Sequence, residues 1–235
     1  MSVAALWRET IATGHRNLDL FAIVAAAFFF LPQLAAGLLE PATGTPPGGA
    51  NLLLVVGVTL IGLVGQGAIT RMALDDLLRQ PGTVGGAVGH AVRRLPQLLA
   101  GNLVAGLAIG LGLIALIVPG IWLLGRFGPL TPVVMAEGRD LVGSVERSWA
   151  LTQAHAWPAA VYLLLLLVLL LSLLFTGSLV AAALAAVSTI AGARGLGEVA
   201  TSVAISAAAA GGVAFIYVAQ AVLYRQLLAL TGQPR

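Results

Sequence analysis

The sequence predicts an all-α membrane protein, a polytopic bundle of six transmembrane helices with short amphipathic helices at the membrane surface. Three observations support this fold class. Of the 235 residues, 59% are hydrophobic and only 9% are charged, whereas about 25% of a soluble domain is charged. Long apolar runs recur, and about 20 apolar residues are enough for a helix to cross the hydrocarbon core. The short alternating segments typical of a transmembrane barrel do not occur in the sequence.

Six runs are long enough to span a bilayer. The first two are linked by the Pro/Gly-rich stretch "EPATGTPPGGAN". The last two are longer than a span requires, so we expect them to tilt, bend or protrude. The six predicted spans cover residues 18–39, 51–70, 97–118, 121–137, 158–187 and 199–229.

The arginines predict the orientation of the spans. All twelve basic residues are arginine, and basic loops stay on the cytoplasmic side. One set of loops carries ten arginines, the other set carries only Arg194, and Arg126 lies inside a span. Both termini are therefore predicted to be cytoplasmic, with outward turns near residues 40–50, 119–120 and 188–198. The ten arginines are Arg8, Arg16, Arg71, Arg79, Arg93, Arg94, Arg139, Arg147, Arg225 and Arg235.

Three amphipathic segments, residues 2–13, 84–95 and 141–152, each precede a pair of spans. This order predicts one membrane domain over residues 1–235, built from three units of an interfacial helix and a transmembrane hairpin. The alternative is that short amphipathic helices simply flank the spans. Thr83 and Asp140 stand where an N-cap is needed. The predicted apolar faces are Val3, Trp7 and Ile11; Val84, Val88 and Val92; and Leu141, Val145 and Trp149.

The fourth span is unusual. Pro119-Gly120 separates two apolar runs almost without a loop, and Pro-Gly is a strong turn signal, so a tight hairpin is expected there. The span that follows is short. Prolines within it remove backbone donors, and carbonyls freed in lipid must be satisfied by protein or water. We therefore expect this span to pack inside the bundle or to line a wet cavity. The residues that weaken it are Gly125, Gly128, Pro129 and Pro132.

Arg126 is the one basic residue within a span. Six residues past the predicted turn, it would lie about 9 Å deep in helical geometry. One hypothesis is that it binds an anion or a lipid phosphate in a cavity, since ionisable residues within membranes are functional candidates. The other is that it bonds the carbonyls freed by Pro129 and Pro132, or extends its head group toward water.

The other polar residues of the spans are interpreted as interhelical hydrogen-bonding groups. They are Gln33, Gln66, Asn102, Thr176, Ser178 and Gln220. Gly106 and Gly110 form a G-x-x-x-G pattern, which favours close helix contact.

The sequence offers little support for catalysis. His15, His90 and His155 lie far apart, Asp75-Asp76 reads as a solvated helix face beside Arg71, and no metal-binding or nucleophile motif occurs. Cysteine is absent, which excludes thiolate metal sites. The prediction is therefore a protein that is not an enzyme and has no cofactor and no metal. No basic run points to nucleic acid.

The stretch "VPGIWLLGRFGPLTPVVMAEGRDLVGSVERSWALTQAHAW" resembles the bacterial membrane-domain family of glycerophosphodiester phosphodiesterases and related stand-alone six-span inner-membrane proteins. The resemblance implies a six-span fold in the bacterial cytoplasmic membrane. Enzymes of this kind carry a soluble barrel after the spans. Because this chain ends at Arg235, we expect no phosphodiesterase activity. The matching residues are Pro119, Gly120, Trp122, Arg126, Pro132, Glu137, Gly138, Ser148, Trp149 and Thr152.

The functional hypothesis is an accessory, scaffold or lipid-recognising role in the bacterial envelope. A small transporter or channel, with Arg126 lining an anion path, is the alternative. The expected partners are membrane lipids, chiefly anionic ones. The sequence also leaves open that the protein binds a protein partner or a second copy of the chain. The predicted lipid-binding residues are Arg126, Glu137, Arg93, Arg94 and Arg147. The predicted structural motif comprises Pro119, Gly120, Pro129, Pro132, Ser148 and Trp149.

Overall fold

The computed structural model describes residues 2–39, 49–190 and 192–232, and these residues form helices and no strand. Six helical segments are long and apolar enough to cross a membrane. The chain is therefore a multi-pass membrane protein of the predicted all-α class. The predicted outer turn at residues 40–50 falls mostly outside the described residues, as does Arg235.

The first unit begins with the amphipathic helix α1 and continues with a span that changes pitch. A π-helical turn divides this span just before Pro32. The proline ring would clash with the carbonyl four residues earlier in a regular helix, and a wider turn relieves that clash. The elements are α1 (Val3–Arg16), α2 (Leu18–Ala25), η1 (Ala26–Phe30), α3 (Leu31–Leu39) and α4 (Gly49–Leu77).

In the second unit, the tight hairpin is present but its turn lies earlier than predicted. The only residue between the two helices is Leu116, which is extended (φ −159°, ψ 135°). Pro119 and Gly120 instead belong to the first turns of the next helix, where the missing N–H of proline costs nothing. The fourth span is itself two helices, separated at Gly128-Pro129. The elements are α5 (Val84–Arg93), α6 (Leu95–Ala115), α7 (Ile117–Phe127) and α8 (Leu130–Glu137).

The third unit is an interfacial helix followed by the longest hairpin. Its elements are α9 (Leu141–Thr152), α10 (Ala156–Ile190) and α11 (Arg194–Thr231). At about 1.5 Å per residue, α10 and α11 are each longer than the roughly 30 Å hydrocarbon core, as the sequence predicted.

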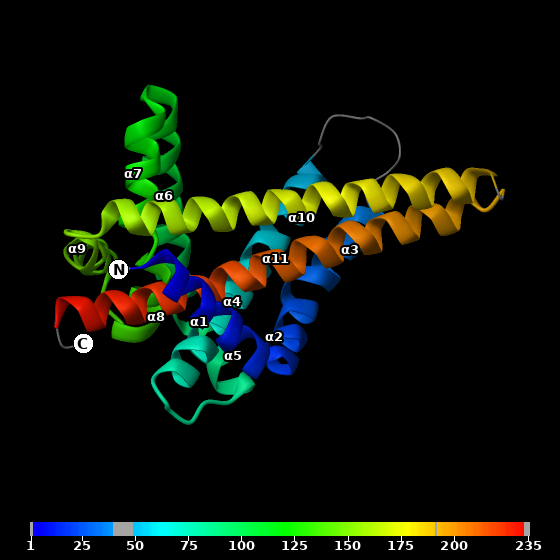
Figure 1. Cartoon of the computed structure of the whole chain (residues 1–235). Coiled ribbons are helices and arrows are strands. Elements are labelled where there is room, and N and C mark those ends of the chain that lie inside the picture. Colours follow the sequence, from blue (N-terminus) through cyan, green and yellow to red (C-terminus); the bar gives the residue numbers. More distant parts are fainter. Residues whose placement is uncertain (1, 40–48, 191, 233–235) are drawn as a thin grey trace.

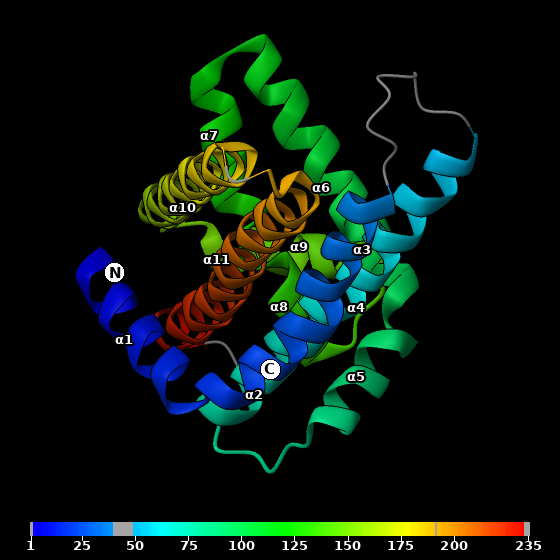
Figure 2. The ribbon, with the colours of Figure 1, turned by 90° about the vertical axis from the view of Figure 1, so that its right-hand side faces the viewer.

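The three hairpins share a base, and their helices run from it in different directions (Figures 1 and 2). Their second members meet in the middle, where α11 packs against α4 and both contact α8. Fully buried apolar side chains such as Ile69, Val133 and Leu223 form the core at this junction. The outer helices keep large apolar side chains exposed, for example Ile114 and Phe175, which is what a lipid-facing surface requires.

The interfacial helices α1, α5 and α9 surround this base (Figures 1 and 2). The predicted N-caps of α5 and α9 are confirmed, because Thr83 accepts from the Gly86 amide and Asp140 from the Gly143 amide. The residues turned to the bundle lie beside the predicted apolar faces. They are Ala87 and Ala91 on α5 and Ser144, Ser148, Leu151 and Thr152 on α9. Val84 and Val88 pack beside the core, Leu141 and Val145 are half-buried, and Val92 and Trp149 stay exposed.

The fourth span packs inside the bundle, as expected for a helix interrupted by proline. Of its most apolar stretch, 56% is buried, against 39% or less for each of the other spans. Most of this burial belongs to α8, whose residues 130–135 are all buried.

Candidate functional site

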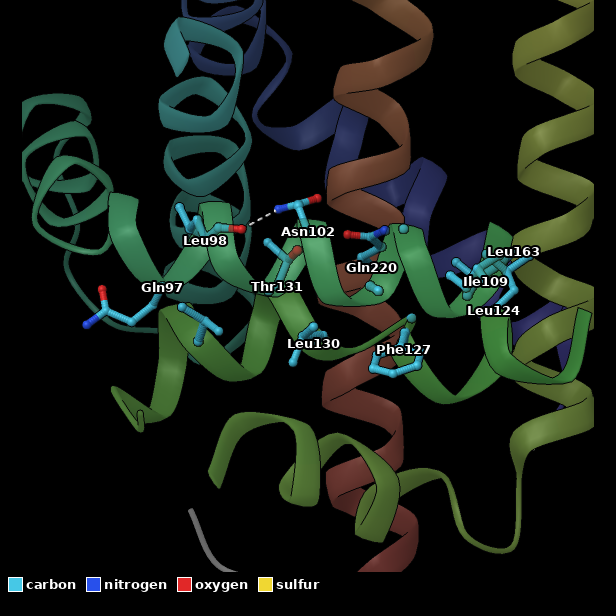
Figure 3. A pocket seen from close by; sticks show the side chains of 15 residues that line it. Gln97, Leu98, Asn102, Ile109, Leu124, Phe127, Leu130, Thr131, Leu163 and Gln220 are labelled. Atoms are coloured by element: carbon cyan, nitrogen blue, oxygen red, sulfur yellow. Dashed lines mark hydrogen bonds between the residues drawn. The ribbon is translucent and has the colours of Figure 1, made fainter. Parts of the chain in front are cut away.

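A cavity of about 240 Å³ lies between α6, α7 and α8, with single residues contributed by α10 and α11 (Figure 3). Its lining contains no charged residue. The apolar wall includes Leu98, Ile109, Leu124, Phe127, Leu130 and Leu163, and the polar lining consists of Gln97, Asn102, Thr131 and Gln220.

The break at Gly128-Pro129 creates this cavity. It redirects the fourth span, so that Leu130 and Thr131 at the start of α8 lie against α6 rather than continuing the line of α7. Leu130 packs on Gly101, where an added Cβ would lie 3.4 Å from the leucine Cδ2. Gly106 also lines the cavity and is exposed. The small residues of α6 thus leave room beside the bent span.

A chain of hydrogen bonds crosses one wall of the cavity. Asn102 Nδ2 donates to Gln66 Oε1 (3.3 Å), and Gln66 Nε2 donates to Thr131 Oγ1 (2.8 Å). Figure 3 shows Asn102, Thr131 and Gln220 close together on the same side of the site. The Oε1 atom of Gln220 is buried and accepts no hydrogen bond from the described residues. The cavity therefore offers an unused acceptor next to a neutral polar cluster.

Arg126 lies outside the lining of this cavity, in a clamp between α7 and α9. Its Nη1 donates to the Trp149 carbonyl (2.9 Å), and its own carbonyl accepts from Ser148 Oγ (2.6 Å). The guanidinium lies 4.7 Å from the centre of the Trp122 ring and 5.3 Å from that of Trp149. Such cation–π contacts favour a desolvated guanidinium, so α7 and α9 together stabilise the charge.

This placement contradicts the hypothesis that Arg126 bonds the carbonyls freed by Pro129 and Pro132. With the turn at Leu116, Arg126 is about 15 Å along the helix from the hairpin turn and reaches the interfacial helix α9. The carbonyl that it contacts belongs to Trp149, and not to a residue preceding Pro129 or Pro132. Pro129 is the N-cap of α8 and Pro132 lies in its first turn.

Glu137 is the centre of a second polar cluster, at the end of α8. Its side chain is only 2% exposed. It accepts hydrogen bonds from Arg139 Nε (2.7 Å), Arg147 Nε (2.9 Å) and the Tyr224 hydroxyl (2.9 Å). The carboxylate thereby joins α8, α9 and α11.

Further arginines bind the backbone at this helix end. Arg94 Nη1 donates to the Gly138 carbonyl (2.9 Å), and Arg71 Nη1 to the Met135 carbonyl (3.4 Å). Cations are stabilising at a helix C-terminus. Gly138 adopts φ +65°, and a Cβ there would collide with the Arg94 guanidinium. Arg94 and Arg147 thus stabilise the packing of neighbouring helices around the end of α8.

Arg93, by contrast, is exposed, and its Nε donates only within α5, to the Gly89 carbonyl (3.2 Å). The neighbouring His90 has a pKa below its usual range, because burial disfavours the charged imidazole and because Arg71, Arg94 and Arg93 lie nearby. His90 is therefore neutral at neutral pH.

The structure brings together residues that the sequence analysis interpreted only as separate interhelical hydrogen-bonding groups. Gln66 and Gln220 reach the same polar cluster from α4 and α11, and Thr131, which the sequence did not single out, joins them from α8. A signal was present: Gln66 stands five residues before Arg71, and Gln220 five before Arg225. Because the two glutamines lie equally far from arginines at the same end of the bundle, the end with α1, α5 and α9, both amides lie at the same depth in the bundle.

Among the described residues, no three side chains of His, Asp or Glu are grouped so that they could hold a metal ion. No protein-family model, no curated protein and no solved structure matches the chain. The resemblance to the phosphodiesterase membrane domain stays a prediction.

Proposed function

We propose that the protein is a lipid-recognising accessory or scaffold protein of the bacterial cytoplasmic membrane, which binds the uncharged polar part of a membrane lipid in the cavity beside α8. The observation that carries this proposal is a neutral polar cluster in a mostly apolar cavity within the spans. Asn102, Thr131 and Gln220 line the cavity, and the buried Gln66 is hydrogen-bonded to Asn102 and Thr131.

The lining indicates the chemistry of the ligand. An anion would find no cation in this cavity, because none of the lining residues is charged. A hydroxyl group fits better, since it both donates and accepts, and it can donate to the unused Oε1 of Gln220. Asn102 and Gly106 are exposed, so the cavity opens beside α6, where lipid would surround the protein. Its occupant is then a neutral lipid carrying a hydroxyl, with its chain along the apolar wall.

Transport is the alternative that the sequence raised. An anion path lined by Arg126 would need that guanidinium to face the cavity, whereas it is held by Trp122, Trp149 and the Trp149 carbonyl. This arrangement favours recognition over anion transport.

Replacing Gln220 by leucine tests the proposal. The change removes the buried acceptor, and the amount of co-purifying hydroxyl-bearing lipid should fall by about tenfold or more, as expected for a lost buried hydrogen bond. Native mass spectrometry of protein extracted in mild detergent measures this. Gln33→Leu is the matched control, because Gln33 is an exposed amide of α3. Equal lipid content in wild type and Gln220→Leu would refute the proposed site.

The proposed orientation has its own test. The arginine-rich end of the bundle, with α1, α5 and α9, is placed in the cytoplasm by the preference of basic segments for that side. Reporters fused at residues 85 and 143 should be cytoplasmic, and a reporter fused at residue 193 external. An external signal at 143 would contradict the six-span topology.

A further inference from the structure

A second cavity, of about 360 Å³, lies at the end of the bundle where α1 packs, and it shares no lining residue with the cavity beside α8, here called the neutral cavity. It is formed where α1 meets the ends of α4 and α11, which lie side by side in Figure 2. Three arginines line it, namely Arg16, Arg79 and Arg225, together with Glu9 and Asp76.

Two of the three arginines are neutralised by the two carboxylates. Arg16 Nη2 lies 2.6 Å from Asp76 Oδ2, and Arg225 is paired with Glu9. Gln226 Nε2 also donates to Glu9 (2.9 Å), so both carboxylates are engaged. Arg79 has no side-chain hydrogen bond or ion pair among the described residues and is exposed at the mouth of the cavity. The lining therefore carries one unbalanced positive charge.

The backbone of Arg79 is the second observation. Its φ of +53° makes it the one non-glycine residue with positive φ in the described chain. It terminates α4 in a Schellman arrangement, with the Arg79 amide bonded to the Asp76 carbonyl and the Gln80 amide to the Asp75 carbonyl (2.7 Å). Glycine is the usual residue at this left-handed position. An arginine there is strained, and strain of this kind accumulates at functional sites.

A third observation concerns the inner wall. Thr13 of α1 lines the cavity and is fully buried, and its hydroxyl has no hydrogen-bond partner in the described residues. A buried hydroxyl without a partner is unfavourable. A ligand oxygen in the cavity would supply the missing acceptor.

We propose that this cavity binds a phosphate group. Arg79 supplies the unbalanced charge, the remaining N–H groups of Arg16 and Arg225 supply further donors, and the Thr13 hydroxyl supplies a neutral one. Guanidinium groups match the oxygens of phosphate in geometry. The phosphate belongs either to a lipid headgroup, since the site lies at the membrane-surface end of the bundle, or to a soluble molecule.

Arg79→Gly provides the sharpest test. Glycine relieves the left-handed strain, so the variant should unfold at a higher temperature than wild type when no phosphate is present. It also removes the cation, so its affinity for phosphate should fall by about tenfold or more. A residue with a merely structural role would not produce this opposite pair of effects. Arg8→Gln is the matched control, because it removes an exposed arginine of α1 that does not line the cavity and should leave phosphate affinity unchanged.

The probes are inorganic phosphate and a short-chain phosphatidic acid, each titrated into protein in zwitterionic detergent while the unfolding temperature is followed by tryptophan fluorescence. A response to both probes that is lost in Arg79→Gly supports a soluble phosphate as ligand, and a response to phosphatidic acid alone that is lost in the same variant supports a lipid headgroup. No response of wild type to either probe, or a response retained in Arg79→Gly, would overturn the proposal. Gln220→Leu should leave these responses intact, which separates this site from the neutral cavity.

Discussion

Replacing Glu137 by leucine is expected to lower the free energy of unfolding by about 3–5 kcal/mol, the usual cost of removing one member of a buried ion pair. The carboxylate is 2% exposed and accepts from Arg139, Arg147 and Tyr224. Its loss removes the acceptor that joins α8 to α9 and α11. Unfolding in a sodium dodecyl sulfate titration, followed by tryptophan fluorescence, measures the change.

Glu146→Leu is the control for this prediction. Glu146 is an exposed carboxylate on the same helix as Arg147, so its replacement should change stability by no more than about 0.5 kcal/mol. A loss in Glu137→Leu as small as that of the control would show that the buried cluster does not stabilise the fold.

Replacing Gly125 by alanine should lower the free energy of unfolding by about 1–3 kcal/mol, the typical cost of overpacking. Here α7 lies directly against α10: an added Cβ would collide with the Ala156 carbonyl and lie 3.0 Å from the Cβ and amide nitrogen of Ala160. Because the first obstacle is backbone, no side-chain rotation can relieve the clash. The two helices must separate, which would also disturb the neighbouring Arg126 clamp. The same unfolding titration measures this loss.

Gly110→Ala is the matched control, because nothing lies within 4 Å of an added Cβ at Gly110. Its stability should equal or exceed that of wild type, since alanine is the better helix former. If both glycine variants unfolded alike, close approach of α7 and α10 would not determine stability.

Gly110 also illustrates what the sequence could predict. Span number, the amphipathic helices and the caps at Thr83 and Asp140 follow from apolar runs and local chemistry, and the structure agrees. The G-x-x-x-G at Gly106 and Gly110 predicted a helix contact, and this prediction is wrong for the described part of the chain, because no described atom lies within 4 Å of a Cβ added at either glycine. Whether a glycine admits a neighbour depends on which helices face each other, and a local pattern does not contain that information.

The turn and the site show the same limit. Pro119-Gly120 is a turn signal, but proline is equally suited to the first turn of a helix, and the chain turns at Leu116 instead. The polar cavity depends on Gln66, Thr131 and Gln220, which come from three different hairpins. Their meeting is decided by the packing of α4, α8 and α11. The sequence therefore identified Gln66 and Gln220 as polar residues of the spans, but it did not single out Thr131 or show that the three share a site.

The divergence of the three hairpins from their shared base (Figures 1 and 2) has a consequence for the surrounding bilayer. A protein that widens away from its base occupies more area in one leaflet than in the other, and lipid molecules must fill the spaces between the hairpins. Bilayer curvature and lateral pressure then act on the angle between the hairpins. Because α6 and α7 form one hairpin, α10 belongs to another, and all three line the neutral cavity, a change in the angle between these two hairpins would change the shape of that cavity.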